Sequence, residues 1–278
     1  MHPILLQTRQ ALEPYYSSAE VKTLSMMICC DRFGLNATDL YMGKDIKLSE
    51  SEYGELENIL LRLQKKEPIQ YIFGSAMFGG RQFKVTPDVL IPRPETHELV
   101  SLIEQEHPGN SRILDIGTGS GCIAISLDLD LPGAEVEAWD ISNQALAVAE
   151  ENNQVLGGQV RFVCQDVLQA LPSDRPIYNV IVSNPPYIAE SERGNMEANV
   201  TEWEPNGALF VPDNDPLIFY RTIAQLGRSL LVDDGELYFE INQVYGEATI
   251  EMLRHFEYID LRLIKDFYGN DRIVVAKK

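Results

Sequence analysis

The chain has 278 residues, which at about 150 residues per domain predicts two domains, and its hydrophobic content of 45% excludes a wholly disordered protein. It has no uncharged apolar stretch of about 18 residues and no basic segment followed by an apolar one at its start, so we expect neither a membrane span nor a secretory signal. With 42 acidic and 23 basic residues the net charge is −19, which argues against binding nucleic acid by neutralising phosphates and suits solubility or a basic partner.

The first 66 residues carry the signals of a small helical domain. Ser17 and Glu20 form the Ser-x-x-Glu pattern of a capping box, and Ser49 and Glu52 repeat it. After each box, apolar residues recur at helical spacing. We therefore predict that residues 1–66 form an N-terminal helical domain.

Residues 67–95 have the character of a linker. Gly79-Gly80 lies between two short apolar segments and indicates a β-hairpin. The three prolines that follow, between positions 87 and 94, exclude a helix there. We predict a joint that contains one hairpin and connects two larger bodies.

Strand and helix patterns alternate in residues 96–278, which predicts an α/β domain whose parallel sheet is covered by helices on both faces. The last two apolar runs are separated by the turn-forming Gly269-Asn270-Asp271, so they predict a terminal antiparallel hairpin. The predicted strands are residues 112–116, 135–141, 160–164, 179–183, 236–241, 258–264 and 272–276.

A glycine-rich loop follows the first of these strands and reads Asp115-Ile116-Gly117-Thr118-Gly119-Ser120-Gly121. Glycine lets a backbone approach a ligand closely. The third glycine comes one residue earlier than in the G-x-G-x-x-G dinucleotide fingerprint. This variant resembles the first motif of Rossmann-like methyltransferases and favours methyl transfer from S-adenosylmethionine over hydride transfer. The residues expected to contact that cofactor here are Asp115, Gly117, Thr118, Gly119, Ser120 and Gly121.

Acidic residues follow the next two strands of the same sheet. Asp140 ends the second strand, at a position from which a carboxylate can accept hydrogen bonds from ribose hydroxyls. Asp166 follows the third strand, and we expect it near the adenine. Both residues are predicted to bind the cofactor.

A second motif, Asn184-Pro185-Pro186-Tyr187, follows the apolar strand 179–183. In an open α/β sheet, ligands bind outside the carboxyl ends of the strands, so this motif and the glycine loop are predicted to face one crevice. Neither proline has an N–H, and the segment therefore offers carbonyl acceptors and few donors.

Two acceptors and a flat aromatic wall suit a planar –NH2 group. The Asn184 side-chain oxygen and the Pro185 carbonyl can hold the two N–H bonds of an amide and turn its nitrogen toward a methyl donor. These bonds strengthen as the nitrogen becomes cationic, which stabilises the transition state. We predict Asn184, Pro185 and Tyr187 as catalytic residues, all four motif residues as substrate-binding, and Asn184 also as a cofactor contact.

The two motifs resemble those of N-methyltransferases that act on exocyclic amines of bases or on protein glutamine. Three further segments are similar to those of the peptide-chain release factor glutamine methyltransferases: Glu67-Pro68-Ile69-Gln70-Tyr71-Ile72-Phe73-Gly74, Ile91-Pro92-Arg93-Pro94-Glu95-Thr96, and Glu204-Pro205 followed by Ala208-Leu209. The resemblance covers nearly the whole chain.

The resemblance implies a Rossmann-like class I methyltransferase domain with a seven-stranded sheet and a terminal antiparallel hairpin, preceded by a small N-terminal helical domain. It implies S-adenosylmethionine as cofactor and, as substrate, the glutamine of the Gly-Gly-Gln loop of class I release factors, methylated at N5. It also implies that residues 1–66 help to dock the release factor. We expect a cytoplasmic monomer.

A few residues stand outside this interpretation. The family commonly has a second Glu where this chain has His97, which we interpret as a surface residue. Arg93 is predicted either to orient Glu95 or a cofactor carboxylate or to form a salt bridge at the domain hinge, and Glu240 is a candidate for the crevice. The four histidines and the four cysteines lack metal-ligand spacing, so no metal is expected and the cysteines are predicted to be reduced thiols.

Three alternatives remain at the level of sequence. The first is an N6-adenine methyltransferase acting on nucleic acid, which shares the Asn-Pro-Pro-Tyr motif but would need a basic channel. The second is a glutamine methyltransferase of a ribosomal protein. The third is a non-catalytic module that retains a nucleotide pocket.

Overall fold

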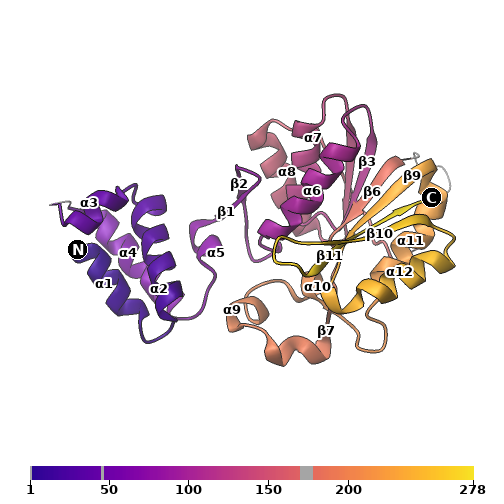
Figure 1. Ribbon diagram of the computed structural model, residues 1–278. Coiled ribbons are helices and arrows are strands. Elements are labelled where there is room, and N and C mark those ends of the chain that lie inside the picture. The colour runs from indigo at the N-terminus through magenta and orange to yellow at the C-terminus, as the bar shows by residue number, and fades with distance from the viewer. Residues whose placement is uncertain (1, 45–46, 170–177) are drawn as a thin grey trace. The chain divides into compact units, whose positions relative to one another are not determined.

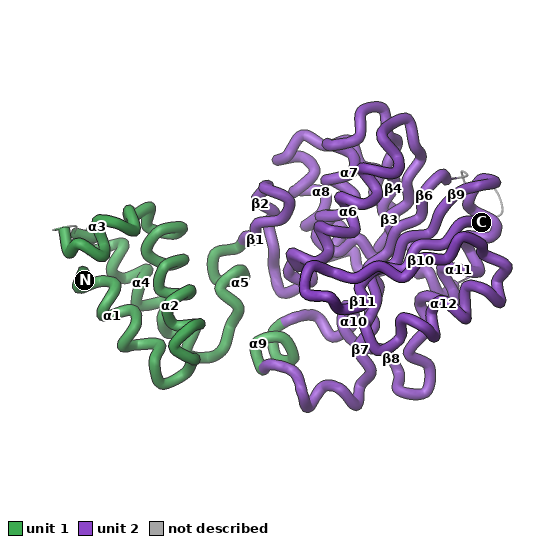
Figure 2. The backbone as a smooth tube through the Cα atoms, in the orientation of Figure 1, with its two compact units in different colours: residues 1–74, 198–203 green, residues 75–197, 204–278 purple. Residues whose placement is uncertain are grey.

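The computed structural model describes residues 2–44, 47–169 and 178–278. The chain divides into two compact units (Figure 2). Unit 1 contains residues 1–74 together with 198–203, and unit 2 contains residues 75–197 together with 204–278. Each unit has its own buried apolar core.

Unit 1 is helical (Figure 1). Both predicted capping boxes are present, because the side chains of Ser17 and Ser49 accept from the backbone of the residue three positions on and the glutamates there bond back. The segment 198–203 belongs to this unit, and the Trp203 indole donates to the Lys65 carbonyl at 3.3 Å. The helices are α1 (Pro3–Leu12), α2 (Ser18–Met26), which continues as a π-helix (Met27–Arg32), α3 (Ala37–Met42), α4 (Glu50–Leu63), α5 (Ile69–Phe73) and α9 (Ala198–Thr201).

Unit 2 begins with the predicted hairpin. Strands β1 (Ser75–Phe78) and β2 (Arg81–Lys84) pair antiparallel across Gly79 and Gly80, whose φ angles of 54° and 76° favour glycine. Helix α6 (Pro94–Glu106) begins at the last of the three prolines. A proline is tolerated in a first helical turn, since its missing N–H would have no partner within the helix.

Within the described residues, seven strands form one sheet in the order β10-β11-β9-β6-β3-β4-β5. Strands β9, β6, β3, β4 and β5 are parallel, and β11 runs antiparallel between β9 and β10, which confirms the predicted terminal hairpin. The strands are β3 (Arg112–Ile116), β4 (Glu135–Asp140), β5 (Arg161–Cys164), β6 (Tyr178–Ser183), β9 (Leu231–Glu240), β10 (Ile259–Lys265) and β11 (Asp271–Lys277).

Helices cover both faces of this sheet, as predicted (Figure 1). Apolar residues of α6 and α7 (Cys122–Asp130) belong to one buried cluster, with α8 (Asn143–Leu156) packed beside α7. Residues of α11 (Ile218–Leu230) and α12 (Gly246–His255) belong to a second cluster. The remaining elements are β7 (Ile188–Ala189) paired with β8 (Phe210–Val211), α10 (Asn206–Leu209), and two 3-10 helices, Glu190–Asn195 and Gln243–Tyr245.

Strand register brings the two sequence motifs together. Ile116 at the end of β3 pairs with Ser183 at the end of β6, and the Ser183 hydroxyl donates to the Ile116 carbonyl at 2.6 Å. Gly117, the first glycine of the loop, directly follows β3, and Asn184, the first residue of the Asn-Pro-Pro-Tyr motif, directly follows β6. They therefore leave the sheet side by side at its carboxyl edge.

Candidate active site

A pocket of about 410 Å³ lies at this carboxyl edge, entirely within unit 2. Seven of the predicted site residues line it: Gly117, Gly119, Asp140, Asp166, Asn184, Pro185 and Pro186. The Glu-Pro segment recognised in the sequence contributes Pro205, Gly207 and Ala208 to the same pocket. The prediction that both motifs face one crevice therefore agrees with their positions.

The remaining predicted residues do not line the pocket. The Thr118 hydroxyl donates to the Asp115 carboxylate at 2.7 Å, and Ser120, also in the loop, is buried. A Cβ at Gly121 would lie 2.8 Å from the Ile125 side chain, so this glycine allows the loop to pack closely against α7. Tyr187 lies beside the pocket and reaches Glu240.

Asp115 is fully buried, and burial raises the pKa of its carboxyl to about 7. One of its oxygens accepts from Thr118, whereas the other, Oδ1, has no hydrogen-bond partner within the described part of the chain. A buried polar atom without a partner is costly unless a ligand or water satisfies it.

The glycine loop is held from outside by two side chains. Asp140 accepts the Gly119 N–H at 2.9 Å and, through its other oxygen, the Ser142 N–H at 2.9 Å. Asn152 of α8 donates to the Ser120 carbonyl at 2.9 Å. Gly119 has a φ of 56° and open space where a Cβ would stand. The loop therefore exposes its backbone in a fixed position.

Apolar side chains follow the two acidic residues and line the same pocket. Ile141, next to Asp140, is 65% exposed, and Leu168, two residues after Asp166, is 45% exposed. The Asp166 carboxylate accepts the Leu168 N–H at 2.9 Å and so fixes that turn. Exposed apolar surfaces at a pocket suit a flat hydrophobic ring. The other lining residues that the sequence did not indicate are Asp88, Val89, Leu90, Ile116, Ser142, Ala145, Gln165, Val167, Ser183, Phe219 and Ile223.

A buried hydrogen-bond chain lies behind Asn184. The Asn184 Nδ2 donates to the Thr96 hydroxyl at 3.3 Å, and that hydroxyl donates to Glu240 at 2.6 Å. The Tyr187 hydroxyl donates to the other oxygen of Glu240 at 3.3 Å. Burial raises the pKa of Glu240 above its usual value, and it also raises the pKa of Tyr187. Glu240, a candidate in the sequence, thus contacts two residues that the sequence motifs contain.

Arg93 and His97 have structural partners. Glu204 accepts from the Arg93 guanidinium at 2.5 Å and from the Ile91 N–H at 3.1 Å, so it joins the Ile-Pro-Arg-Pro segment to the Glu-Pro segment. The His97 ring packs edge-to-face on Phe78, with 5.4 Å between the ring centroids, and covers Gly79. His97 therefore contacts the hairpin and does not line the pocket.

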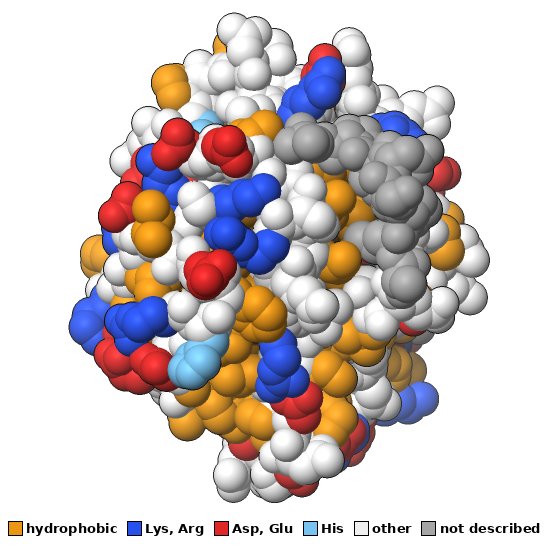
Figure 3. Space-filling model, turned by 90° about the vertical axis from the view of Figure 1, so that its right-hand side faces the viewer, with side chains coloured by type: hydrophobic (Ala, Val, Ile, Leu, Met, Phe, Trp, Pro, Cys, Tyr) orange, Lys and Arg blue, Asp and Glu red, His pale blue; other side chains and the backbone are white. Residues whose placement is uncertain are grey.

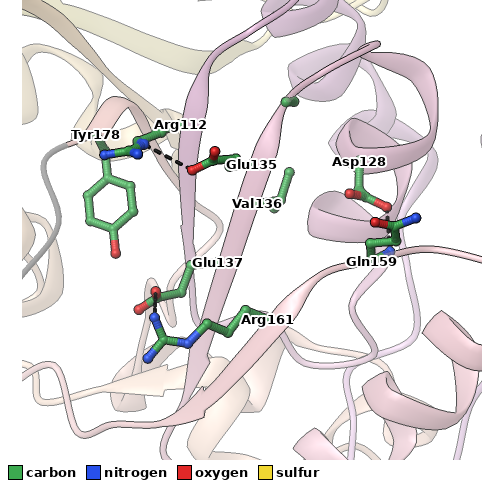
Figure 4. A pocket seen from close by; sticks show the side chains of 9 residues that line it. Arg112, Asp128, Glu135, Val136, Glu137, Gln159, Arg161 and Tyr178 are labelled. Atoms are coloured by element: carbon green, nitrogen blue, oxygen red, sulfur yellow. Dashed lines mark hydrogen bonds and ion pairs between the residues drawn. The ribbon is translucent and has the colours of Figure 1, made fainter.

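A second pocket, of about 330 Å³, lies at the amino ends of the strands (Figure 4). Four of its charged side chains form two ion pairs, Arg112 with Glu135 and Arg161 with Glu137, each at 3.0 Å, and Asp128 accepts the Gln159 N–H at 2.7 Å. Ligands of parallel sheets bind at the opposite, carboxyl edge. The pocket beside the glycine loop is therefore the candidate active site.

Surface charge and possible metal ligands are relevant to the alternative functions considered from the sequence. On the face drawn in Figure 3, Lys and Arg side chains are interspersed with Asp and Glu side chains and with hydrophobic ones. In residues 2–44, 47–169 and 178–278, no three His, Cys, Asp or Glu side chains gather as a metal site would require. In the same ranges, none of the helices combines the length and apolar character needed to cross a membrane.

Comparison with known proteins identifies the family. Residues 4–74 match the family described as PrmC N-terminal domain, and residues 94–217 match the methyltransferase small domain. The release factor glutamine methyltransferase of Bacteroides thetaiotaomicron is 59% identical over 278 residues, covering 100% of both chains. This chain belongs to the release factor glutamine methyltransferase family.

Other relatives of this glutamine methyltransferase family agree. The release factor glutamine methyltransferase of Flavobacterium psychrophilum is 43% identical and covers 95% of this chain and 94% of its own. A solved methyltransferase structure from Pyrococcus furiosus has a TM-score of 0.56 at 16% identity, covering 80% of this chain and 98% of that one. These matches confirm the resemblance seen in the motifs and the class I methyltransferase fold.

Proposed function

We propose that this chain transfers a methyl group from S-adenosylmethionine to the side-chain N5 of the glutamine in the Gly-Gly-Gln loop of class I release factors. One observation carries the proposal: Asn184 and Pro185 line the same pocket as Gly117 and Gly119 of the glycine loop. The pocket can thus hold a cofactor and a carboxamide together. The names of the full-length relatives supply the identity of the substrate.

The residues of the pocket fit the proposed cofactor. Asp115 does not line the pocket, and its Oδ1 has no hydrogen-bond partner among the described residues, so a buried water would link it to the α-ammonium of S-adenosylmethionine. Asp140 lines the pocket and has lone pairs left for ribose hydroxyls, while Ile141 and Leu168 offer apolar surface for the adenine. When bound, the cofactor supplies an electrophilic methyl group on a sulfonium.

The chain's own residues then act on the glutamine. Asn184 Oδ1 and the Pro185 carbonyl accept the two N–H bonds of the substrate amide and direct its nitrogen toward the methyl donor. Pro186 has no N–H, so it offers no donor that would compete for the amide. As the nitrogen becomes cationic, both bonds strengthen, and the cationic amide then loses one proton to water. Fixed orientation of the two reactants supplies a large part of the acceleration.

The helical segment 1–66 belongs to this proposal as a docking element for the release factor. Its family match covers residues 4–74 and is separate from the match of the methyltransferase domain. The four cysteines are free thiols, which agrees with a cytoplasmic setting, and we propose that the enzyme acts there as a monomer.

The direct test is intact-mass and peptide-mapping analysis of a class I release factor incubated with the enzyme and S-adenosylmethionine. We expect a gain of one methyl mass on the glutamine of the Gly-Gly-Gln peptide, and no gain when the cofactor is omitted. An unchanged release factor would refute the proposal. Parallel incubations with ribosomal proteins and with nucleic acid would show whether either is the true acceptor.

A further inference from the structure

An asparagine carboxamide has two orientations of nearly the same shape, related by a half-turn of its terminal bond. With Asn184 Oδ1 toward the pocket, the side chain accepts an N–H of the substrate. After a half-turn, its own –NH2 would face the substrate –NH2, and two donors cannot bond. The proposed reaction therefore requires that one orientation be selected.

We infer that Thr96 and Glu240 are positioning residues that hold the Asn184 carboxamide with its oxygen toward the substrate. This inference rests on the proposed function. Neither residue needs to touch the glutamine, because both act through Asn184. They come from different elements, since Thr96 lies in the first turn of α6 and Glu240 is the last residue of β9.

The direction of the hydrogen bonds carries the argument. A threonine hydroxyl has one proton, and Thr96 donates that proton to Glu240 Oε2 at 2.6 Å. Toward Asn184 the hydroxyl can therefore only accept, and it accepts from Nδ2 at 3.3 Å. The –NH2 of Asn184 is thus fixed toward the buried Thr96 hydroxyl. Oδ1, on the opposite side of the carboxamide, is then directed away from Thr96.

Burial makes this direction hard to reverse. Thr96 is 2% exposed and Glu240 is 1% exposed, so water does not replace the bond between them. An ionised carboxylate accepts hydrogen bonds and cannot donate, and Glu240 receives two hydroxyl protons, from Thr96 and from Tyr187. Burial raises the pKa of Glu240, and the hydrogen bonds from Thr96 and Tyr187, together with the positive charge of Arg272, oppose that rise.

Glu240 also links the two ends of the Asn-Pro-Pro-Tyr motif. Its Oε2 acts on Asn184 through Thr96, and its Oε1 accepts from Tyr187 directly at 3.3 Å. The strand register explains the contact, since β9 runs parallel to β6 and Phe239 pairs with Ser183. One buried carboxylate therefore fixes both the amide and the aromatic ring of the motif.

The test compares Thr96→Val, which keeps the shape and removes the hydroxyl, with Thr96→Ser, which keeps the hydroxyl. Thr249→Val is the matched control, because Thr249 is a buried threonine whose hydroxyl donates to the Tyr245 carbonyl of its own helix start. We expect Thr96→Val to lower kcat about tenfold, the value of one lost hydrogen bond, with the Kd of S-adenosylmethionine within about twofold. Thr96→Ser and Thr249→Val should stay within about twofold in both quantities.

A second readout needs no substrate. In enzyme labelled with 15N-asparagine, the Asn184 side-chain amide signal is assigned by its loss in Asn184→Ala. We expect its protons to exchange slowly in the unmutated enzyme and in Thr96→Ser, and rapidly in Thr96→Val. Because this measurement involves no release factor, it tests the orientation even if the proposed substrate is wrong, whereas absent methylation by the unmutated enzyme counts against the proposed function alone.

Unchanged kcat and slow exchange in Thr96→Val would overturn the inference, as would a Thr96→Ser variant as impaired as Thr96→Val. If Thr96→Val does not fold, Tyr187→Phe takes its place, since it keeps the ring and removes only the other hydroxyl bonded to Glu240. Slow exchange of the Asn184 amide should persist in Tyr187→Phe. Its loss there would overturn the inference, because Tyr187→Phe leaves the bonds from Asn184 to Thr96 and from Thr96 to Glu240 in place.

Discussion

Asp140, the last residue of β4, accepts the backbone N–H of Gly119 at 2.9 Å and so fixes the loop that follows the neighbouring strand β3. Its second oxygen accepts the Ser142 N–H. One carboxylate thus shapes two loops of the pocket that it also lines. Its burial raises its pKa, and the backbone donors oppose that rise.

We expect Asp140→Ala to raise the Kd of S-adenosylmethionine ten- to hundredfold, since each hydrogen bond to a charged group is worth about 1.5–3 kcal/mol. Calorimetric titration measures this change. Asp215→Ala is the control, because Asp215 pairs with Arg221 on an exposed helix start and does not line the pocket. A Kd within about twofold of the unmutated value would show that Asp140 does not support cofactor binding.

The raised pKa of Asp115 predicts a pH dependence of stability. Its folded pKa of about 7 lies above the value of 3.8 expected in the unfolded chain, so the folded protein binds this proton more tightly and protonation of Asp115 stabilises the fold. That contribution is fully present below pH 3.8 and is lost as the pH rises toward 7. Asp115→Asn removes this titration, so the variant should not lose stability over this range. The difference between its melting temperature and that of the unmutated enzyme should therefore increase from about pH 5 to about pH 7 and then stay constant.

The same group predicts a pH dependence of cofactor binding. If an ammonium group satisfies Asp115, binding requires the ionised carboxylate, and affinity for S-adenosylmethionine should increase by up to about tenfold per pH unit below the folded pKa. The Asp115→Asn variant should bind more weakly and show a flatter profile. An unmutated profile that is flat between about pH 5.5 and 7 would contradict the proposed contact.

We expect Asn184→Ala to lower kcat at least about a hundredfold, which is the usual effect of removing one preorganised hydrogen-bond partner from a transition state. The melting temperature should change by only a few degrees, because Asn184 is half-buried at the start of the loop that follows β6. Intact-mass time courses with a release factor provide the rate, and thermal unfolding provides the control. Transfer at the unmutated rate would exclude Asn184 from the reaction.

The hairpin offers a stability test that is independent of function. A Cβ at Gly79 would lie 2.7 Å from the His97 ring, whereas a Cβ at Gly80 would meet nothing within 4 Å, and both residues have positive φ. Backbone strain in each Gly→Ala variant should therefore lower the free energy of unfolding by about 1–2 kcal/mol. Gly79→Ala should lower it further, because its Cβ would also clash with the His97 ring.

A double-mutant cycle with His97→Ala separates the two terms. Urea unfolding should show that Gly79→Ala costs at least about 0.5 kcal/mol less in the His97→Ala background, while the cost of Gly80→Ala is the same in both. Equal costs for Gly79→Ala in both backgrounds would mean that the histidine does not restrict this turn.

Local signals in the sequence predicted much of the fold. The capping boxes at Ser17 and Ser49 depend on residues three positions apart, and the hairpin at Gly79-Gly80 depends on two adjacent glycines, so no long-range information was needed. The glycine loop and the Asn-Pro-Pro-Tyr motif were likewise continuous segments. Their placement in one pocket followed from the rule for strand ends in parallel sheets.

Contacts between distant segments could not be predicted in the same way. Nothing near Arg93 indicates that its partner is Glu204, which lies 111 residues away, and nothing near Thr96 indicates Glu240, which lies 144 residues away. Asp115 was expected to contact the cofactor, but it is completely buried on the central strand β3 and does not line the pocket. These features depend on tertiary packing, which short motifs do not encode.

Strand β10 forms one edge of the large sheet, and an open edge is where the sheets of two molecules could join into an aggregate. Its pairing with β11 is irregular between Ile259 and Arg262 and again at Lys265, and Asp260 has a positive φ of 49°. Three of its seven residues are charged: Asp260, Arg262 and Lys265. A strand from another molecule would therefore find no uninterrupted row of amide and carbonyl groups to pair with, which protects this edge of the sheet from amyloid-like stacking.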